Sequence, residues 1–162
     1  MTEHLIAEMV QYYQGDPKRI QHFMKVHDFS RTIGLLEGLD ANTLFILETA
    51  AVVHDIGIHL CEDKYGSCEG KLQEQEGPVI AKAMLEKLGY DSMVIERVCY
   101  LVGHHHTYTN IDGIDYQILV EADFLVNLFE DDVPIDAVKV AYNKIFHTES
   151  GKGICKNMFG II

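Results

Sequence analysis

Histidine side chains occur on the apolar faces of two predicted helices. His22 lies on the same face as Val26, because residues three, four or seven positions apart align along an α-helix. In the next helix, His54 follows Leu47 by seven positions and shares its face. His27 lies about 140° around the helix from His22, so we expect it on the flank. Two imidazoles are therefore predicted to point into the interior.

Carboxylates and further imidazoles occupy similar positions. Asp55 ends its helix, Asp123 shares an apolar face with Val126, and another helix ends in His104 and His105. A single inward His or Asp is usually a hydrogen-bonded core residue or a cap, but that explanation would have to hold on each helix separately. One shared cation explains all of them, since a buried charge is costly unless it is paired or bound to a metal. Imidazole and carboxylate ligands suit a divalent transition metal (Fe, Mn, Zn, Ni or Co), and carboxylate-rich sites also bind Mg.

The elements that must position these residues are helical almost throughout. The 3.6-residue apolar period predicts an all-α, compact multi-helix bundle without a convincing strand. The expected helices cover residues 2–14, Pro17–Glu37, a segment from Asp40 or Asn42 to Ile56, 71–88, Asp91–His105, 114–129, a segment after Pro134 and a segment after Thr148. We expect loops at 58–70 and 107–113. No composition shift marks a linker, so the prediction is a single domain over residues 1–162.

Charge limits the partners of this chain. It carries 25 acidic and 13 basic residues, for a formal net charge of −12. A nucleic-acid polymer or an anionic membrane surface would need a basic face, so neither is expected as a partner. A phosphorylated small molecule would also be repelled at long range, unless a bound metal reverses the sign locally.

The N-terminus and the cysteines indicate a cytoplasmic protein. The first 16 residues carry early charges and no long apolar run, which is unlike a signal peptide or a membrane span. The four cysteines, Cys61, Cys68, Cys99 and Cys155, form no CxxC pattern. We expect free thiols, with a regulatory disulfide between Cys61 and Cys68 as the alternative.

Five segments resemble the HD-domain superfamily of metal-dependent phosphohydrolases. They are RIQHFMKV (19–26), AAVVHDIG (50–57), LVGHHH (101–106), LVEADFLVN (119–127) and HTESGK (147–152). The resemblance spans about residues 17–155. It implies an HD-domain-like fold and a first metal held by His22, His54, Asp55 and Asp123, with Asp55 and His54 as the catalytic residues.

The resemblance also implies a second metal in many members, and here the sequence departs from the pattern. Asp55 would bridge to that ion, and we favour His104 and His105 over His106 as its other ligands. Gln73 stands where such members have a further His ligand, so one ion is expected and the second stays open. Glu74 and Glu76 are the candidate substitutes.

A second departure concerns phosphate binding. Members often have a Lys directly after the HDIG segment, where this chain has Ile58. His59 and Lys64 are the remaining candidates for binding substrate, although solvated loop positions are the simpler explanation for both. The residues that bind substrate therefore stay unknown at this point.

The function that the resemblance implies is hydrolysis of a small-molecule phosphate ester, a nucleotide or nucleotide-derived compound first, by attack of metal-activated water. The alternative is a catalytically inactive metal- or nucleotide-binding regulatory module. A di-iron oxygenase is a third hypothesis, and it needs a complete second metal site. Apolar residues of the first or last helix are candidate contacts of a homodimer.

Overall fold

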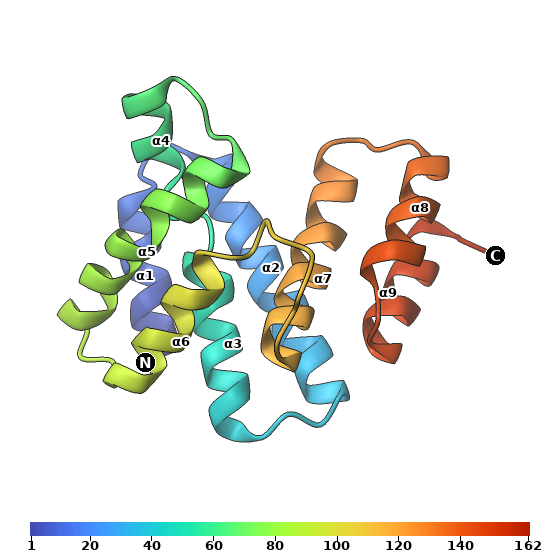
Figure 1. Cartoon of the computed structure of the whole chain (residues 1–162), viewed down its shortest axis with the longest axis horizontal. Coiled ribbons are helices and arrows are strands. Elements are labelled where there is room, and N and C mark those ends of the chain that lie inside the picture. Colours follow the sequence, from blue (N-terminus) through green and yellow to red (C-terminus); the bar gives the residue numbers. More distant parts are fainter.

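The computed structural model describes residues 1–162 and contains helices but no strand (Figure 1). In chain order the helices are α1 Thr2–Tyr12, α2 Pro17–Leu36, α3 Ala41–Val53, α4 Ile58–Tyr65, α5 Gly70–Lys87, α6 Ser92–Val102, α7 Ile114–Glu130, α8 Ile135–Ile145 and α9 Glu149–Phe159. The prediction of an all-α bundle is confirmed.

Side-chain caps fix where several helices begin. The Asp16 side chain accepts a hydrogen bond from the Arg19 amide and Pro17 opens α2, while Asp40 and Asp91 cap α3 and α6 in the same way. Such caps satisfy amide groups that have no partner within the helix. The predicted starts of these helices are confirmed.

The core is built around α3, which packs against α1, α2, α6 and α7. Every residue from Ile46 to Val53 is buried, so this part of the helix has no solvated face. Within the stretch Ala41–Tyr65 the most apolar 18-residue window has a mean hydropathy of 1.5, which by length and composition would suit a membrane span, but 72% of that window is buried inside the bundle. Its central position therefore explains its apolar character.

The expected loop over 58–70 is wrong for most of its length. Residues Ile58–Tyr65 form α4, and only Gly66–Glu69 separate it from α5. Ile58 and Cys61, one turn apart, are both buried, which gives this short helix its inner face. Gly66 ends it in the left-handed conformation, at φ 66°.

The C-terminal helices α8 and α9 pack against α7 and against each other (Figure 1). Glu121 on α7, whose carboxylate is fully buried, connects α7 to the segment that begins α9. It accepts hydrogen bonds from the amides of His147 and Thr148, from the Thr148 hydroxyl and from Gln117. Thr148 in turn caps α9 through the Gly151 amide. The HTESGK segment is thus the structural link between α9 and the helix that carries Asp123.

Candidate metal centre

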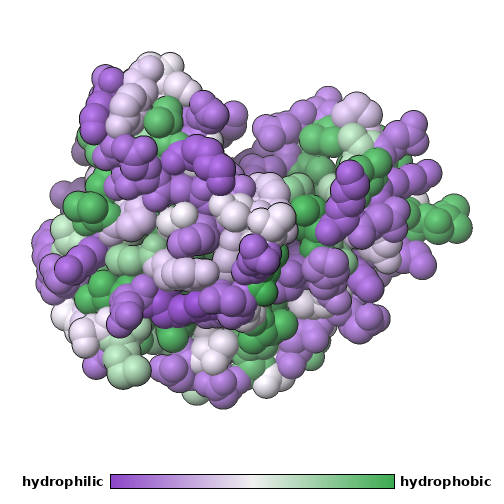
Figure 2. Space-filling model, in the orientation of Figure 1, coloured by the Kyte–Doolittle hydropathy of each residue, from purple (hydrophilic) through white to green (hydrophobic).

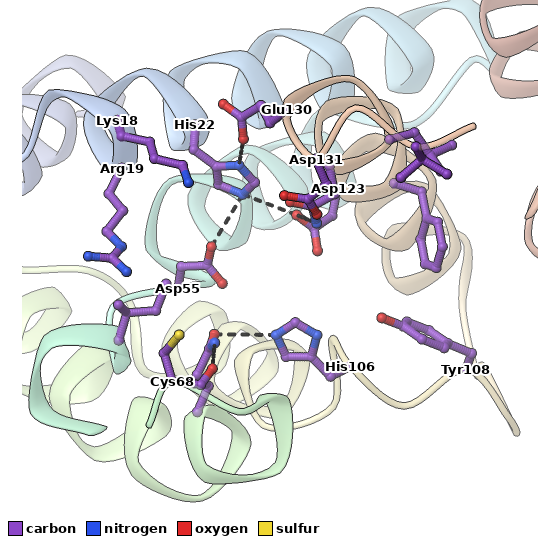
Figure 3. A pocket seen from close by; sticks show the side chains of 16 residues that line it. Lys18, Arg19, His22, Asp55, Cys68, His106, Tyr108, Asp123, Glu130 and Asp131 are labelled. Carbon is purple, nitrogen blue, oxygen red and sulfur yellow. Dashed lines mark hydrogen bonds and ion pairs between the residues drawn. The ribbon is translucent and has the colours of Figure 1, made fainter. Parts of the chain in front are cut away.

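The four expected ligands of the first metal converge from three elements. His22 lies on α2, Asp123 lies on α7, and His54 and Asp55 lie in the turn that follows α3. Figure 3 shows His22, Asp55 and Asp123 directed toward one point at the base of a cavity. Segments far apart in the sequence therefore place their polar groups together.

The separations between these groups suit a metal ion. The Nε2 atom of His22 lies 3.1 Å from Asp123 Oδ1, 3.2 Å from Asp55 Oδ2 and 3.3 Å from His54 Nε2. The Nε2 atom of His54 lies 3.4 Å from each of the same carboxylate oxygens. Ligands bonded at about 2.1 Å to one ion lie roughly 3.0–3.4 Å apart in octahedral or tetrahedral geometry. The four side chains thus fit one divalent cation.

The opposite ring nitrogens fix how the two imidazoles are oriented. Nδ1 of His54 donates to the Ala51 carbonyl at 2.7 Å, and Nδ1 of His22 donates to Glu130 at 2.7 Å. Such partners hold a ligand imidazole in place and increase its basicity. The sequence-based prediction missed Glu130, although it lies seven residues after Asp123, on the same face of α7.

Without a cation, the carboxylates hold these imidazoles in the protonated form. Burial alone would lower the pKa of His22, but hydrogen bonds to Asp123 and Asp55 outweigh it and raise that pKa to about 11. Burial would also lower the pKa of His54, but the negative charge of Asp55 outweighs it and raises that pKa to about 10. Burial disfavours the ionised form of Asp123, yet the hydrogen bonds from both imidazoles hold its pKa below the usual range.

Metal binding should therefore release protons. Near pH 7 a cation must displace the Nε2 protons of His22 and His54, whose pKa values are raised to about 11 and about 10. The apparent affinity should rise with pH, because each imidazolium is present below its raised pKa and competes with the metal there. Calorimetry in buffers of different ionisation enthalpy should give close to two protons released per ion. Binding without proton release would contradict this protonation state.

A second group of polar side chains lies beside the first. Asp55 Oδ1 is 3.2 Å from His105 Nε2, and ligand atoms of Asp55, His105 and His106 all lie within 4.8 Å of one another. The choice of His104 over His106 is not supported, because His104 is turned away. Its Nδ1 donates to the Tyr100 carbonyl at 2.7 Å and its ring stacks on Tyr100. The helical part of α6 ends at Val102, so helical spacing no longer gives the directions of these side chains.

Gln73 occupies the remaining side of this second group. It is buried, its amide nitrogen donates to the Cys68 carbonyl, and its Oε1 lies 3.3 Å from His106 Nε2. An amide oxygen only accepts hydrogen bonds, so that contact requires a proton on His106 Nε2 and leaves that nitrogen without a lone pair for a metal. Glu74 and Glu76 do not replace the missing ligand. Glu74 accepts a hydrogen bond from Thr107, and Glu76 accepts hydrogen bonds from Lys64 and Tyr65.

Two tyrosines at the C-terminal end of α1, Tyr12 and the adjacent Tyr13, hold the turn that carries Asp55. The hydroxyl of Tyr13 donates to the Asp55 carbonyl at 2.5 Å, and that of Tyr12 donates to the Ile56 carbonyl at 3.1 Å. Tyr13 is 1% exposed, so its ring is fixed by packing. The first helix thus positions the backbone of a candidate ligand.

Tyr13→Phe should weaken metal binding while preserving the fold. The ring stays in place and the turn that carries Asp55 loses one hydrogen bond, so this ligand is held less firmly. The dissociation constant of the ion should rise about tenfold, the lower end of the effect of removing a group that orients a ligand. Tyr90→Phe is the matched control, because its hydroxyl donates to the Met1 carbonyl, away from the site. Equal metal affinities in the two variants would argue against this role for Tyr13.

A cavity of about 490 Å³ opens over the first group of ligands. Figure 2 shows the mainly hydrophilic surface notched between the α4–α5 end and the α8–α9 end of the molecule. The sequence-based candidates for substrate binding lie outside this cavity. His59 pairs with Asp16 at 2.8 Å, and Lys64 pairs with Glu76 at 3.0 Å.

The fold and the site together define an all-helical protein with a histidine–aspartate centre suited to a divalent cation. The family model described as HD domain matches residues 19–141, and the chain belongs to this family. Among solved structures, a predicted HD superfamily hydrolase from an uncultured Thermotogales bacterium is similar at a TM-score of 0.69 and 22% identity. The match covers 98% of this chain and 84% of that one, and at this identity it shows a shared fold. No curated protein matches.

Proposed function

We propose that the protein is a metal-dependent phosphohydrolase that acts on a small phosphate ester, with a nucleotide or nucleotide-derived compound as the first class to examine. One observation carries the proposal: four side chains suited to one divalent cation meet at the base of an open cavity. Membership of the HD-domain family supports a metal-dependent phosphohydrolase in general terms.

The bound cation and Asp55 have different roles in the proposed reaction. A divalent cation bound there would lower the pKa of a water molecule bound to it and would screen the charge of the phosphoryl oxygens. Asp55 directs Oδ2 toward His22 and Oδ1 toward His105, so one carboxylate can bind the ion and also orient the attacking water. In the reaction the water oxygen bonds to phosphorus, the bond from phosphorus to the leaving oxygen breaks, and one proton passes to that oxygen.

Tyr108 is placed to donate a hydrogen bond to the substrate. Burial, reinforced by the nearby Asp123 carboxylate, raises the pKa of Tyr108 to about 12. Its hydroxyl therefore stays protonated near neutral pH and can donate to a phosphoryl or leaving oxygen. The direction of the Tyr108 hydroxyl in Figure 3, into the cavity, fits this role.

One observation favours the alternative of an inactive binding module. Gln73 replaces a metal ligand of many members, and its amide is fixed between Cys68 and His106. The same observation counts against an oxygenase with two irons, because the second group lacks a complete set of ligands.

The deciding experiment loads the purified protein separately with Mn, Fe, Zn, Ni, Co and Mg and assays a panel of phosphate esters. We expect hydrolysis with at least one metal and its loss in Asp123→Asn, which removes a ligand charge while keeping the side-chain size. A panel without turnover for any loaded form would favour the binding module. Oxidative cleavage by a form holding two irons would favour the oxygenase.

A further inference from the structure

Lys18 is an unpaired cation in a strongly acidic protein. Most basic side chains form ion pairs with acidic neighbours. The basic side chains without such a partner are Lys18, Lys139, Lys144 and Lys156. Among these, only Lys18 lines the cavity over the metal centre. An ammonium group in that position is available to bind an anion.

The neighbouring Arg19 is not available in the same way. Its Nη1 lies 3.0 Å from Asp16 Oδ2 and 3.0 Å from Glu62 Oε1, so its charge is already neutralised. Figure 3 shows Lys18 reaching into the cavity from the side of α2, near His22, and Tyr108 reaching in from the opposite side. An anion bound at the metal centre would lie between these two donors.

Apart from Lys18 and the ion-paired Arg19, the cavity has no lysine or arginine, and its wall combines apolar, neutral polar and acidic side chains. Phe124, Leu128 and Val133 line it, and the ring of Tyr108 packs edge-on against Phe124 at 5.1 Å. Asp131 also lines the cavity and forms no ion pair. A second or third phosphate would therefore add negative charge to a cavity that already holds an unpaired carboxylate, and the like charges would repel each other.

We propose that Lys18 binds the phosphoryl group of the substrate, and that this substrate is a phosphate monoester with an uncharged leaving group that carries an apolar or aromatic ring. The proposal rests on the phosphohydrolase function above and adds a recognition residue and a substrate class to it. Neither part follows from the ligands of the metal, because Lys18 and the apolar wall lie outside that set.

Phosphate binding tests the first part without turnover. Inorganic phosphate is titrated into the metal-loaded protein by calorimetry, using the parent chain, Lys18→Met and Lys139→Met. Lys139 is the matched control, being exposed and unpaired on α8. Loss of one charge-assisted hydrogen bond should raise the dissociation constant of phosphate about tenfold in Lys18→Met, with no change in Lys139→Met or in metal content. Unchanged phosphate affinity, or loss of metal from Lys18→Met, would overturn the role of Lys18.

Competition by adenosine mono-, di- and triphosphate against phosphate tests the second part. The monophosphate should bind most tightly, and tighter binding of the triphosphate would overturn the substrate class. The two proposals fail separately. If phosphate binds in a Lys18-dependent way but no ester is hydrolysed, the anion site stands and the phosphohydrolase function falls. If esters are hydrolysed but Lys18→Met behaves as the parent chain, the function stands and the role of Lys18 falls.

Discussion

His22→Ala is expected to remove the metal ion and with it any hydrolytic activity. The Nε2 atom of His22 lies within 3.3 Å of His54 Nε2 and closer still to Asp55 and Asp123, so its loss opens one side of the centre. Removing a partner that only orients a ligand typically costs 10–100-fold in metal affinity. Loss of the ligand itself should cost more than about 100-fold. Metal analysis after gel filtration, together with an ester assay, measures both effects.

His27→Ala is the matched control on the same helix. His27 lies on the flank of α2, where its Nε2 is 2.9 Å from Glu48 Oε1. This variant should keep its metal and its activity, and it should lose only the stability that the contact with Glu48 provides. Metal retained in His22→Ala but lost in His27→Ala would mean that α2 presents the other histidine.

Gly151→Ala is expected to have the largest effect on stability. A Cβ atom at this position would lie 1.9 Å from Glu121 Oε1 and 2.7 Å from Thr148 Oγ1. The carboxylate cannot easily move, because Glu121 is fully buried and holds the start of α9 through several hydrogen bonds. Overpacking combined with damage to a buried charged hydrogen-bond network should cost about 3 kcal/mol. For a chain of this size the melting temperature should fall by about 6–12 °C.

Gly153→Ala provides the control two residues further along α9. A Cβ atom there would contact nothing within 4 Å. Replacing glycine by alanine inside a helix without strain should stabilise the protein by about 0.5–1 kcal/mol. Thermal unfolding of the two variants should therefore shift in opposite directions. A similar decrease in both would mean that the buried carboxylate does not constrain Gly151.

The helices and the first group of ligands could be predicted because they follow helical spacing. His22, His54 and Asp123 each lie on a long helix or directly at its end, so the apolar residues of that helix indicate the direction of the side chain. The caps at Asp16 and Asp40 were predictable for the same local reason. The structure brings the polar atoms of these side chains together, and their binding of a metal stays a prediction.

The second group could be predicted only in part. Asp55 and His105 were expected there, but the choice between His104 and His106 could not be made because these residues lie where helical periodicity ends. Three histidines in a row follow Val102, and the turn there directs His106 toward Gln73 and His104 toward Tyr100. Helix α4 was missed because eight residues rich in charge offer only two buried positions. The sequence does not indicate an anion-binding role for Lys18. Such a role follows only from the absence of an ion pair and from the position of the side chain in the cavity, and both require the structure.

X-ray diffraction from the metal-loaded protein, recorded at the absorption edge of the bound metal, tests the central claim most directly. An anomalous peak should lie about 2.0–2.2 Å from the Nε2 atoms of His22 and His54 and from a carboxylate oxygen of Asp55 and of Asp123. A fully loaded protein whose peak lies elsewhere, with these four side chains unbound, would contradict the assignment of this site and the reaction proposed for it.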